Sequence, residues 1–161
     1  MSKQEGVFSR HSDEQQKDYE REVRLQYGPD NVNESIRRWN DYGEAKQEAI
    51  MAEGNRVYMD MVGVMEAGQE ADSDEVRAIL ERWQEHLRYF YEPTLEILRG
   101  LGEMYNTDER FIANFQKLHP DLPAYLQEAI AGYVDDLETA ELERMLAEDE
   151  TMQRRLSRLG G

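Results

Sequence analysis

Apolar residues along this chain recur at intervals of three and four positions, the spacing that places them on one face of an α-helix. No segment alternates apolar and polar residues between hairpin turns, so we predict no strands. The clearest helical stripe consists of Val76, Ile79, Leu80, Trp83, Leu87 and Phe90. The expected fold class is all-α, with about six to eight helices in a compact bundle.

Turn and capping residues divide the stripes into separate helices. The predicted boundaries are a turn at 27–30, breaks at Gly43 and Gly68, a capping box of Asp72 with Glu75, a first helical turn at Pro93, a new start at Asp108, and a stop at His119–Pro120. In this interpretation the run Tyr89–Phe90–Tyr91 ends a helix that begins near Asp72. A further helix follows, with its apolar residues between Leu122 and Tyr133.

Both ends of the chain differ in character from its middle. Residues 1–26 are acidic with sparse apolar positions, so we expect them to be partly disordered or weakly helical, with a cap at Ser12. Residues 138–161 place leucines and methionines first among carboxylates and then among arginines, which predicts an amphipathic helical tail. Residues 27–137 remain as the helical core.

The charge balance narrows the classes of partner. The chain has 19 Lys and Arg against 35 Asp and Glu, a formal net charge of −16, which would repel nucleic acid and anionic membranes. We therefore predict no direct nucleic-acid binding and no membrane association. Cysteine is absent, which excludes disulfides, thiolate metal sites and covalent capture through a thiol. With no signal-like apolar run, we expect a cytoplasmic protein.

Residue sets that carry catalysis are missing from the sequence. The three histidines, His11, His86 and His119, have neither the His-Glu-x-x-His spacing of zinc proteases nor a Glu three positions earlier. Gly100 and Gly102 match only part of a dinucleotide fingerprint, and they follow a helix where that motif requires a strand. We accordingly predict that the protein is not an enzyme and has no metal and no cofactor.

Aromatic residues are the remaining signal. Three successive helical residues cannot all face one core, so at least one ring of Tyr89, Phe90 and Tyr91 must lie elsewhere. Rings of this kind either fill the core or line a ligand pocket, and tyrosine suits a wet pocket because its hydroxyl can bond there. For His86, both a packing role and ligand contact stay open.

One block of the chain resembles a known family. Residues 101–111, which read LGEMYNTDERF, resemble the Leu-Gly-x-Met-Tyr-x-x-Asp-x-Arg-Phe block of TipAS-type antibiotic-recognition domains, the effector-binding half of MerR-like activators related to the thiostrepton-induced protein. Supporting matches occur in the family's order at Tyr27–Gly28, Trp39, His86 to Tyr91, Pro120 to Leu126 and Ala129–Ile130. The resemblance covers about Gln26 to Leu137, so the domain assignment is 27–137.

This resemblance implies a globin-like helical fold with a cleft that binds antibiotics, often with N-terminal helices ordering around the ligand. By position, Tyr105 and Phe111 would lie in or beside the cleft, facing a helix that carries His86, Phe90 and Tyr91. Together with the other aromatic candidates, the predicted ligand-binding residues are Trp39, His86, Tyr89, Phe90, Tyr91, Tyr105, Phe111, Phe115 and Tyr125.

Three departures from the family shape the functional hypothesis. The family's DNA-binding half and the cysteine of its founding member have no counterpart here, and Pro120–Pro123 replaces its Pro-Gly-Leu-Ala turn. We therefore expect a stand-alone domain that binds bulky antibiotics or multidrug-type ligands noncovalently, either sequestering them or sensing them for transcriptional regulation. The alternative is a protein-interaction module without a small-molecule ligand, in which the tail forms a homodimer or docks on a partner.

Overall fold

The computed structural model describes residues 29–160, where the chain forms six α-helices and no strand. The helices are α2 (Pro29–Tyr42), α3 (Glu44–Glu66), α4 (Asp74–Leu87), α5 (Leu95–Tyr105), α6 (Glu109–Gln116) and α7 (Leu122–Gly160). The predicted all-α fold is confirmed. The weak helix predicted before residue 26 lies outside the described residues. Within 29–160, no helix combines the length and apolarity needed to span a membrane.

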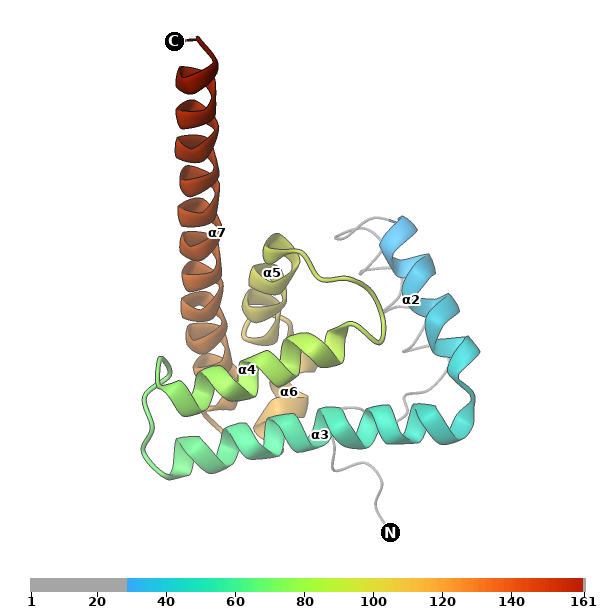
Figure 1. Ribbon diagram of the computed structural model, residues 1–161. Coiled ribbons are helices and arrows are strands. Elements are labelled where there is room, and N and C mark those ends of the chain that lie inside the picture. The colour runs from blue at the N-terminus through green and yellow to red at the C-terminus, as the bar shows by residue number, and fades with distance from the viewer. Residues whose placement is uncertain (1–28, 161) are drawn as a thin grey trace.

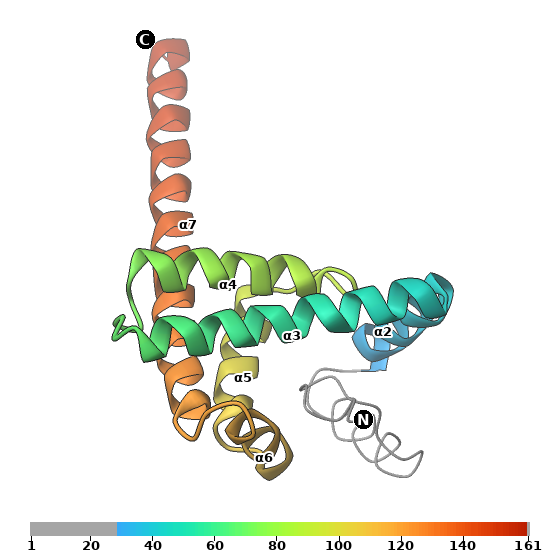
Figure 2. The same cartoon turned by 90° about the horizontal axis from the view of Figure 1, so that it is seen from below.

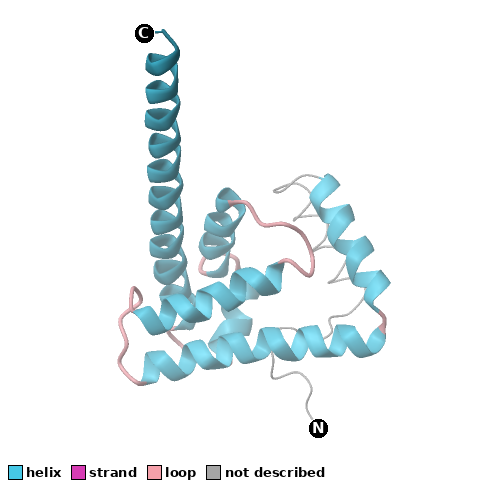
Figure 3. Cartoon of the chain, viewed as in Figure 1, coloured by secondary structure: helices cyan, strands magenta, loops and turns pink. Residues whose placement is uncertain are grey.

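Helices α3 and α4 form an antiparallel hairpin that lies across the first part of α7 (Figures 1 and 2). Helix α5 packs along that same part of α7, and α6 lies at its base beside both. Helix α2 joins the free end of the hairpin and faces the long loop between α4 and α5 (Figure 3). The core therefore lies where α3, α4, α5 and α6 meet the first third of α7.

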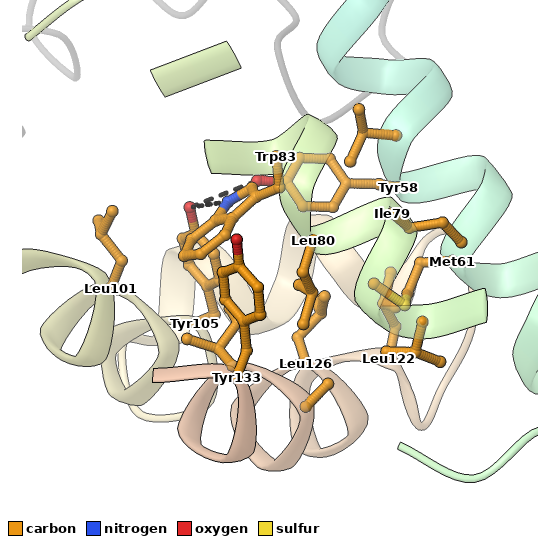
Figure 4. Close-up of a cluster of buried hydrophobic side chains, with 14 of the residues drawn as sticks. Tyr58, Met61, Ile79, Leu80, Trp83, Leu101, Tyr105, Leu122, Leu126 and Tyr133 are labelled. Carbon is orange, nitrogen blue, oxygen red and sulfur yellow. Dashed lines mark hydrogen bonds between the residues drawn. The ribbon is translucent and has the colours of Figure 1, made fainter. Parts of the chain in front are cut away.

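The core is densely apolar and includes a close helix crossing. Its completely buried side chains include Val76, Leu98, Phe115, Leu122, Ile130 and Val134, and part of the cluster is drawn in Figure 4. At Gly102 on α5, a Cβ atom would lie 2.8 Å from Cγ2 of Ile130 on α7. Glycine at this position therefore allows α5 to approach α7 closely, in keeping with the large contact between these two helices.

Several predicted helix boundaries are confirmed, whereas the starts of α2, α4 and α5 differ by a residue or two; α2 begins at Pro29, within the predicted turn. Gly43 and Gly68 both adopt a positive φ of 81°, which ends α2 and α3 at the predicted glycines. Ser73 caps α4 by accepting a hydrogen bond from the Val76 amide, so the predicted cap at Asp72 is incorrect. Thr94 likewise caps α5, which places Pro93 before the helix and not in its first turn.

The predicted end of α4 is also wrong. The helix stops at Leu87, and residues 88–90 form a turn in which the amides of Tyr89 and Phe90 bond back to the carbonyls of His86 and Leu87. The chain leaves the helical path ahead of Pro93, which disfavours helical backbone in the residue before it. Three neighbouring aromatic rings are thus held by a turn and loop, not by a helix face.

Helix α7 passes through the predicted boundary at residue 138 without interruption and extends for 39 residues. What changes there is burial: Leu137 is partly buried, whereas every residue from 138 to 160 is exposed. The end of α7 consequently projects away from the rest of the molecule (Figure 1). The backbone does not mark a domain boundary, so that division remains a prediction.

Candidate functional site

The nine predicted site residues separate into three places in the fold. Four of them, Trp39, His86, Tyr89 and Phe90, meet where α2 faces the turn after α4, and Tyr91 follows in the same loop. Three others, Tyr105, Phe111 and Phe115, stack between α5 and α6. Tyr125 lies apart, near the start of α7. The predicted site is therefore not one continuous group of rings.

The group at α2 and the turn, which we call the junction cluster (Trp39, Tyr42, His86, Tyr89 and Phe90), consists largely of half-buried rings. Trp39 stacks on Phe90 with ring centroids 5.7 Å apart and an interplanar angle of 29°. His86 lies edge-on to Phe90 at 5.8 Å and to Tyr89 at 5.7 Å. Partly exposed stacked rings of this kind offer apolar faces to a flat ligand.

Helix α2 is fixed to the turn by polar contacts on both sides of Trp39. The guanidinium of Arg38 donates a 3.0 Å hydrogen bond to the Arg88 carbonyl, and the Tyr42 hydroxyl donates to the Tyr89 carbonyl. These side chains lie on neighbouring positions of one helix face, so both bonds place Trp39 over Phe90. The side-chain amide of Gln47 also donates to the Trp39 carbonyl at 2.7 Å.

Charged groups border the junction cluster. The Glu53 carboxylate accepts a hydrogen bond from the Tyr89 hydroxyl and raises the pKa of Tyr89, and burial acts in the same direction. The ammonium of Lys46 lies 4.8 Å from the centroid of the Tyr42 ring and 6.0 Å from that of Tyr89, close enough for cation–π attraction. The cluster thus combines apolar ring faces with both an anionic and a cationic side chain.

His86 lies beneath these rings with only 3% of its surface exposed. Its Nε2 atom lies 2.8 Å from the carbonyl oxygen of Ile50 on α3. That contact supports the packing role for His86, because one ring nitrogen is already engaged by the α3 backbone. The imidazole joins α3 to the base of the junction cluster.

The second group is part of the core. Phe115 is completely buried and Tyr105 is 5% exposed, with their ring centroids 4.9 Å apart. The Tyr105 hydroxyl lies 3.3 Å from the Tyr58 hydroxyl, which donates to it, and accepts from the Trp83 indole at 3.4 Å (Figure 4). Burial raises the pKa of Tyr105. Phe111, half-buried, is the ring of this group that reaches the surface.

Tyr125 has a separate structural contact. Its hydroxyl donates a 2.8 Å hydrogen bond to the carbonyl of Gln69 in the loop between α3 and α4. That loop follows the end of α3 at Glu66, roughly 24 Å along the helix from Ile50 at 1.5 Å per residue. Tyr125 therefore belongs to the opposite end of the hairpin from the junction cluster.

Four residues at the junction are absent from the predicted site: Arg38, Tyr42, Lys46 and Glu53. The position of Tyr42, three residues after Trp39 in the same helix, is a signal that could have been used. The contacts of Arg38 depend on a turn fifty residues away, which no local pattern predicts. Among residues 29–160, no group of three metal-ligating side chains occurs.

Comparison with known proteins gives consistent matches. Residues 19–133 match the family described as the TipAS antibiotic-recognition domain. The HTH-type transcriptional activator mta of Bacillus subtilis is 36% identical over 134 residues, which cover 83% of this chain and 51% of that protein. The HTH-type transcriptional activator TipA of Streptomyces coelicolor is 33% identical over 114 residues, covering 70% and 45%. The chain thus spans about half the length of these curated relatives.

A solved structure is also similar. It is nosiheptide in complex with TipAS, from a thiopeptide antibiotic multidrug resistance system of Streptomyces lividans. The two chains superimpose with a TM-score of 0.69 and 31% sequence identity, over 81% of this chain and 90% of that one. Fold and sequence therefore agree on one family, and the resemblance seen at residues 101–111 is confirmed.

Proposed function

This chain belongs to the TipAS antibiotic-recognition domain family, and from that premise we propose that it binds bulky antibiotics or similar drug-like molecules noncovalently at the junction cluster. The observation that carries the proposal is the stacked and half-buried pair of Trp39 and Phe90, fixed by bonds to backbone carbonyls. One solved structure similar to this chain is a complex with nosiheptide. Among the predicted residues, Tyr105 and Phe115 are buried in the core, so we assign them to the fold and not to ligand contact.

Affinity at such a site comes mainly from ring stacking and apolar burial, at about 25 cal/mol for each Å² removed from water. Tyrosine hydroxyls and the neighbouring Glu53 and Lys46 would orient polar groups of the ligand. The chain contains no cysteine, which is why we propose reversible capture without a thioether bond. A net charge of −16 favours neutral or cationic ligands over anionic ones.

The biological role follows from the relatives. We propose that ligand capture serves either sequestration or sensing in transcriptional regulation, because the curated relatives are transcriptional activators. Any contact with DNA would then be made by a separate unit, since the acidic domain itself repels a phosphate backbone. This role also implies a cytoplasmic location and a domain that binds its ligand without transforming it.

Titration with nosiheptide tests the proposal. The complex is expected to quench Trp39 fluorescence, and heat released in calorimetry gives the dissociation constant. Replacing Trp39 or Phe90 with alanine removes a stacked ring and is expected to weaken binding about tenfold or more. Met59→Ala is the matched control, because Met59 is an exposed apolar residue outside the junction cluster and its loss should leave affinity unchanged.

Two results would contradict the proposal. The first is the absence of heat, quenching and melting shift with nosiheptide and with a broad panel of neutral and cationic antibiotics. The second is tight binding that is insensitive to both alanine variants, which would locate the site elsewhere. Ligand recovered in altered form would instead indicate an enzyme.

A further inference from the structure

The projecting segment, residues 138–160 of α7, presents large apolar side chains to solvent. All of its residues are exposed, and its six large apolar side chains have 49% to 84% of their surface accessible. These residues are Leu142, Met145, Leu146, Met152, Leu156 and Leu159. Nothing in the described part of the chain covers them, and Figure 2 shows the segment extending past every other helix. An uncovered stripe of this length is unusual on an isolated soluble helix.

This stripe does not continue the face by which α7 packs on the core. Leu126, Ile130 and Tyr133 define the core face, and Leu137 is its last partly buried member. Leu142 follows Leu137 by five residues, a rotation of about 140° around the helix axis. The two apolar faces of α7 therefore point in different directions, and the second face requires a different partner.

Five of these six residues follow the spacing of a coiled-coil seam, and Leu146 lies beside it, next to Met145. Intervals of three, four, three, four and three residues separate Leu142, Met145, Asp149, Met152, Leu156 and Leu159. Asp149 is the charged exception inside an otherwise apolar seam. A single polar seam residue of this kind specifies how two helices align, at some cost in stability.

The seam is also symmetric along its length. Leu142 and Leu159 are equally distant from the point between residues 150 and 151, and the same holds for Met145 with Leu156 and for Asp149 with Met152. In a two-fold interface, residue i of one copy contacts residue j of the other, and j contacts i. A second copy running antiparallel therefore sets apolar residues opposite apolar residues at four of the six seam positions and Asp149 opposite Met152. A parallel copy would set Asp149 opposite another Asp149.

Charge favours the same arrangement. Residues 138–150 contain six carboxylates and one arginine, whereas residues 151–160 contain three arginines and no carboxylate. Antiparallel pairing places the acidic half of one copy beside the basic half of the other. Glu148 and Arg155 lie seven residues apart on one flank of the seam, so each faces the opposite charge across the interface. Parallel pairing would instead align like charges along the whole segment.

We propose that the projecting segment pairs with the same segment of a second copy of this chain as an antiparallel two-stranded coiled coil. The proposal needs no rearrangement of the core, because residue 160 of the second copy ends opposite Glu141, beyond the last core residue. The projecting segment also needs no separate helix nucleation, because it continues the first third of α7, which packs on the core.

The mass in solution tests this pairing. Light scattering of the full chain is expected to give twice the 18.9 kDa chain mass, falling toward one chain mass on dilution. Leu156→Glu buries a charge in the seam and is expected to raise the dissociation constant of the dimer by about a hundredfold. Ser157→Glu is the matched control, because it adds the same charge at the next position, outside the seam, and should change the constant by only a few-fold. Both variants should keep the thermal midpoint of a dilute sample, since neither residue touches the core.

Orientation is tested by crosslinking and by charge reversal. In a mixture of Met145→Cys and Leu156→Cys chains, antiparallel pairing predicts that mixed disulfides predominate. Glu148→Arg and Arg155→Glu should each weaken the dimer several-fold, and the double variant should restore it. Disulfides between identical chains would overturn the antiparallel arrangement. The proposal would be overturned if the chain had the mass of one copy at every concentration. The same holds if that single copy bound vesicles or another protein. This outcome does not depend on the result with nosiheptide.

Discussion

Gly102 is the residue at which the packing of α5 on α7 is most sensitive to a single atom. Its missing Cβ would lie 2.8 Å from Cγ2 and 3.0 Å from Cβ of Ile130, a completely buried side chain on the other helix. Ile130 is branched at Cβ and has little rotamer freedom in a helix, so it cannot turn aside. The space beside Gly102 is therefore limited by the close approach of the α5 and α7 backbones, and no flexible side chain can move to enlarge it.

Gly102→Ala is expected to lower the free energy of unfolding by up to about 2 kcal/mol. Overpacking against Ile130 costs about 1–3 kcal/mol, which exceeds the gain of up to about 1 kcal/mol from the better helix propensity of alanine. Urea denaturation measures the difference. Gly132→Ala on α7 serves as the control, because a Cβ there would meet no atom of another element within 4 Å and the same propensity gain should stabilise the chain. Equal effects at both positions would contradict this explanation.

Tyr105→Phe is expected to destabilise the fold by about 1 kcal/mol at neutral pH, because the Trp83 indole loses its acceptor. Burial raises the pKa of Tyr105, so the folded chain holds this proton more firmly than the unfolded chain. The resulting stability is fully present below about pH 10 and is lost as pH rises through the folded pKa. Denaturation midpoints above about pH 10 should therefore fall less steeply in the variant. An unchanged slope would show that Tyr105 does not contribute.

For single residues, the sequence identified the aromatic side chains that are candidates for ligand contact, but it did not predict which of them lie together in the fold. Trp39 and Phe90 are contributed by segments about fifty residues apart, and their stacking depends on the docking of α2 on a turn. Tyr105 and Phe115 carry the same kind of side chain yet fill the core. Helical spacing places a ring on a face, whereas burial of that face depends on long-range packing that spacing does not encode.

Individual helices begin and end where short side-chain contacts satisfy their terminal backbone groups. Ser73, Thr94 and Asp108 each accept a hydrogen bond from an amide in the first turn of the helix that follows. The prediction at Asp108 was right and that at Asp72 was wrong, because Asp72 and Ser73 are both good capping residues. Which of two adjacent candidates caps a helix depends on the path of the incoming loop.

The cap of α4 can be measured directly. Ser73→Ala is expected to lower the free energy of unfolding by about 1 kcal/mol, since the Val76 amide loses its acceptor. Asp72→Ala should change it by less than about 0.5 kcal/mol, because Asp72 is exposed and outside the helix. Thermal and urea unfolding of the two variants compare them. The reverse order would restore Asp72 as the cap.

The whole molecule consists of a small packed body and one helix that is much longer than the body needs. Helix positions, the all-α class and the exposed amphipathic end were all predictable, because each follows from periodicity within one segment. The uninterrupted passage of α7 from core to solvent was not, because the change of composition near residue 138 was interpreted as the start of a separate tail. A continuous helix can bury one face in the core along its first part and expose a different apolar face along its last part. The exposed face is then available to a second molecule.

Removing residues 138–161 is expected to change the free energy of unfolding of the body by less than about 1 kcal/mol. Among the ion pairs of the described body, the truncation removes only the exposed one between Arg99 and Glu138, and Arg99 keeps its 2.6 Å contact with Asp135. The carbonyls of the new last turn of α7 are then bonded by water, as at any exposed helix end. The truncated chain should be compared with the Leu156→Glu chain, in which pairing is weakened. Stabilisation of the full chain by dimer formation then does not enter the difference in unfolding free energy. A large loss of stability, or loss of nosiheptide binding, would show that the segment supports the body.

The bonds that dock α2 have an evolutionary consequence. Arg38 and Tyr42 donate to main-chain carbonyls at positions 88 and 89, and every residue type supplies such a carbonyl. The side chains at positions 88 to 91 can therefore diverge without detaching α2 from the turn. If this loop contacts the ligand as we propose, substitutions in it would change ligand preference while the docking of α2 is retained. Directed evolution of altered drug specificity would best begin by randomising these four positions and leaving Arg38 and Tyr42 untouched.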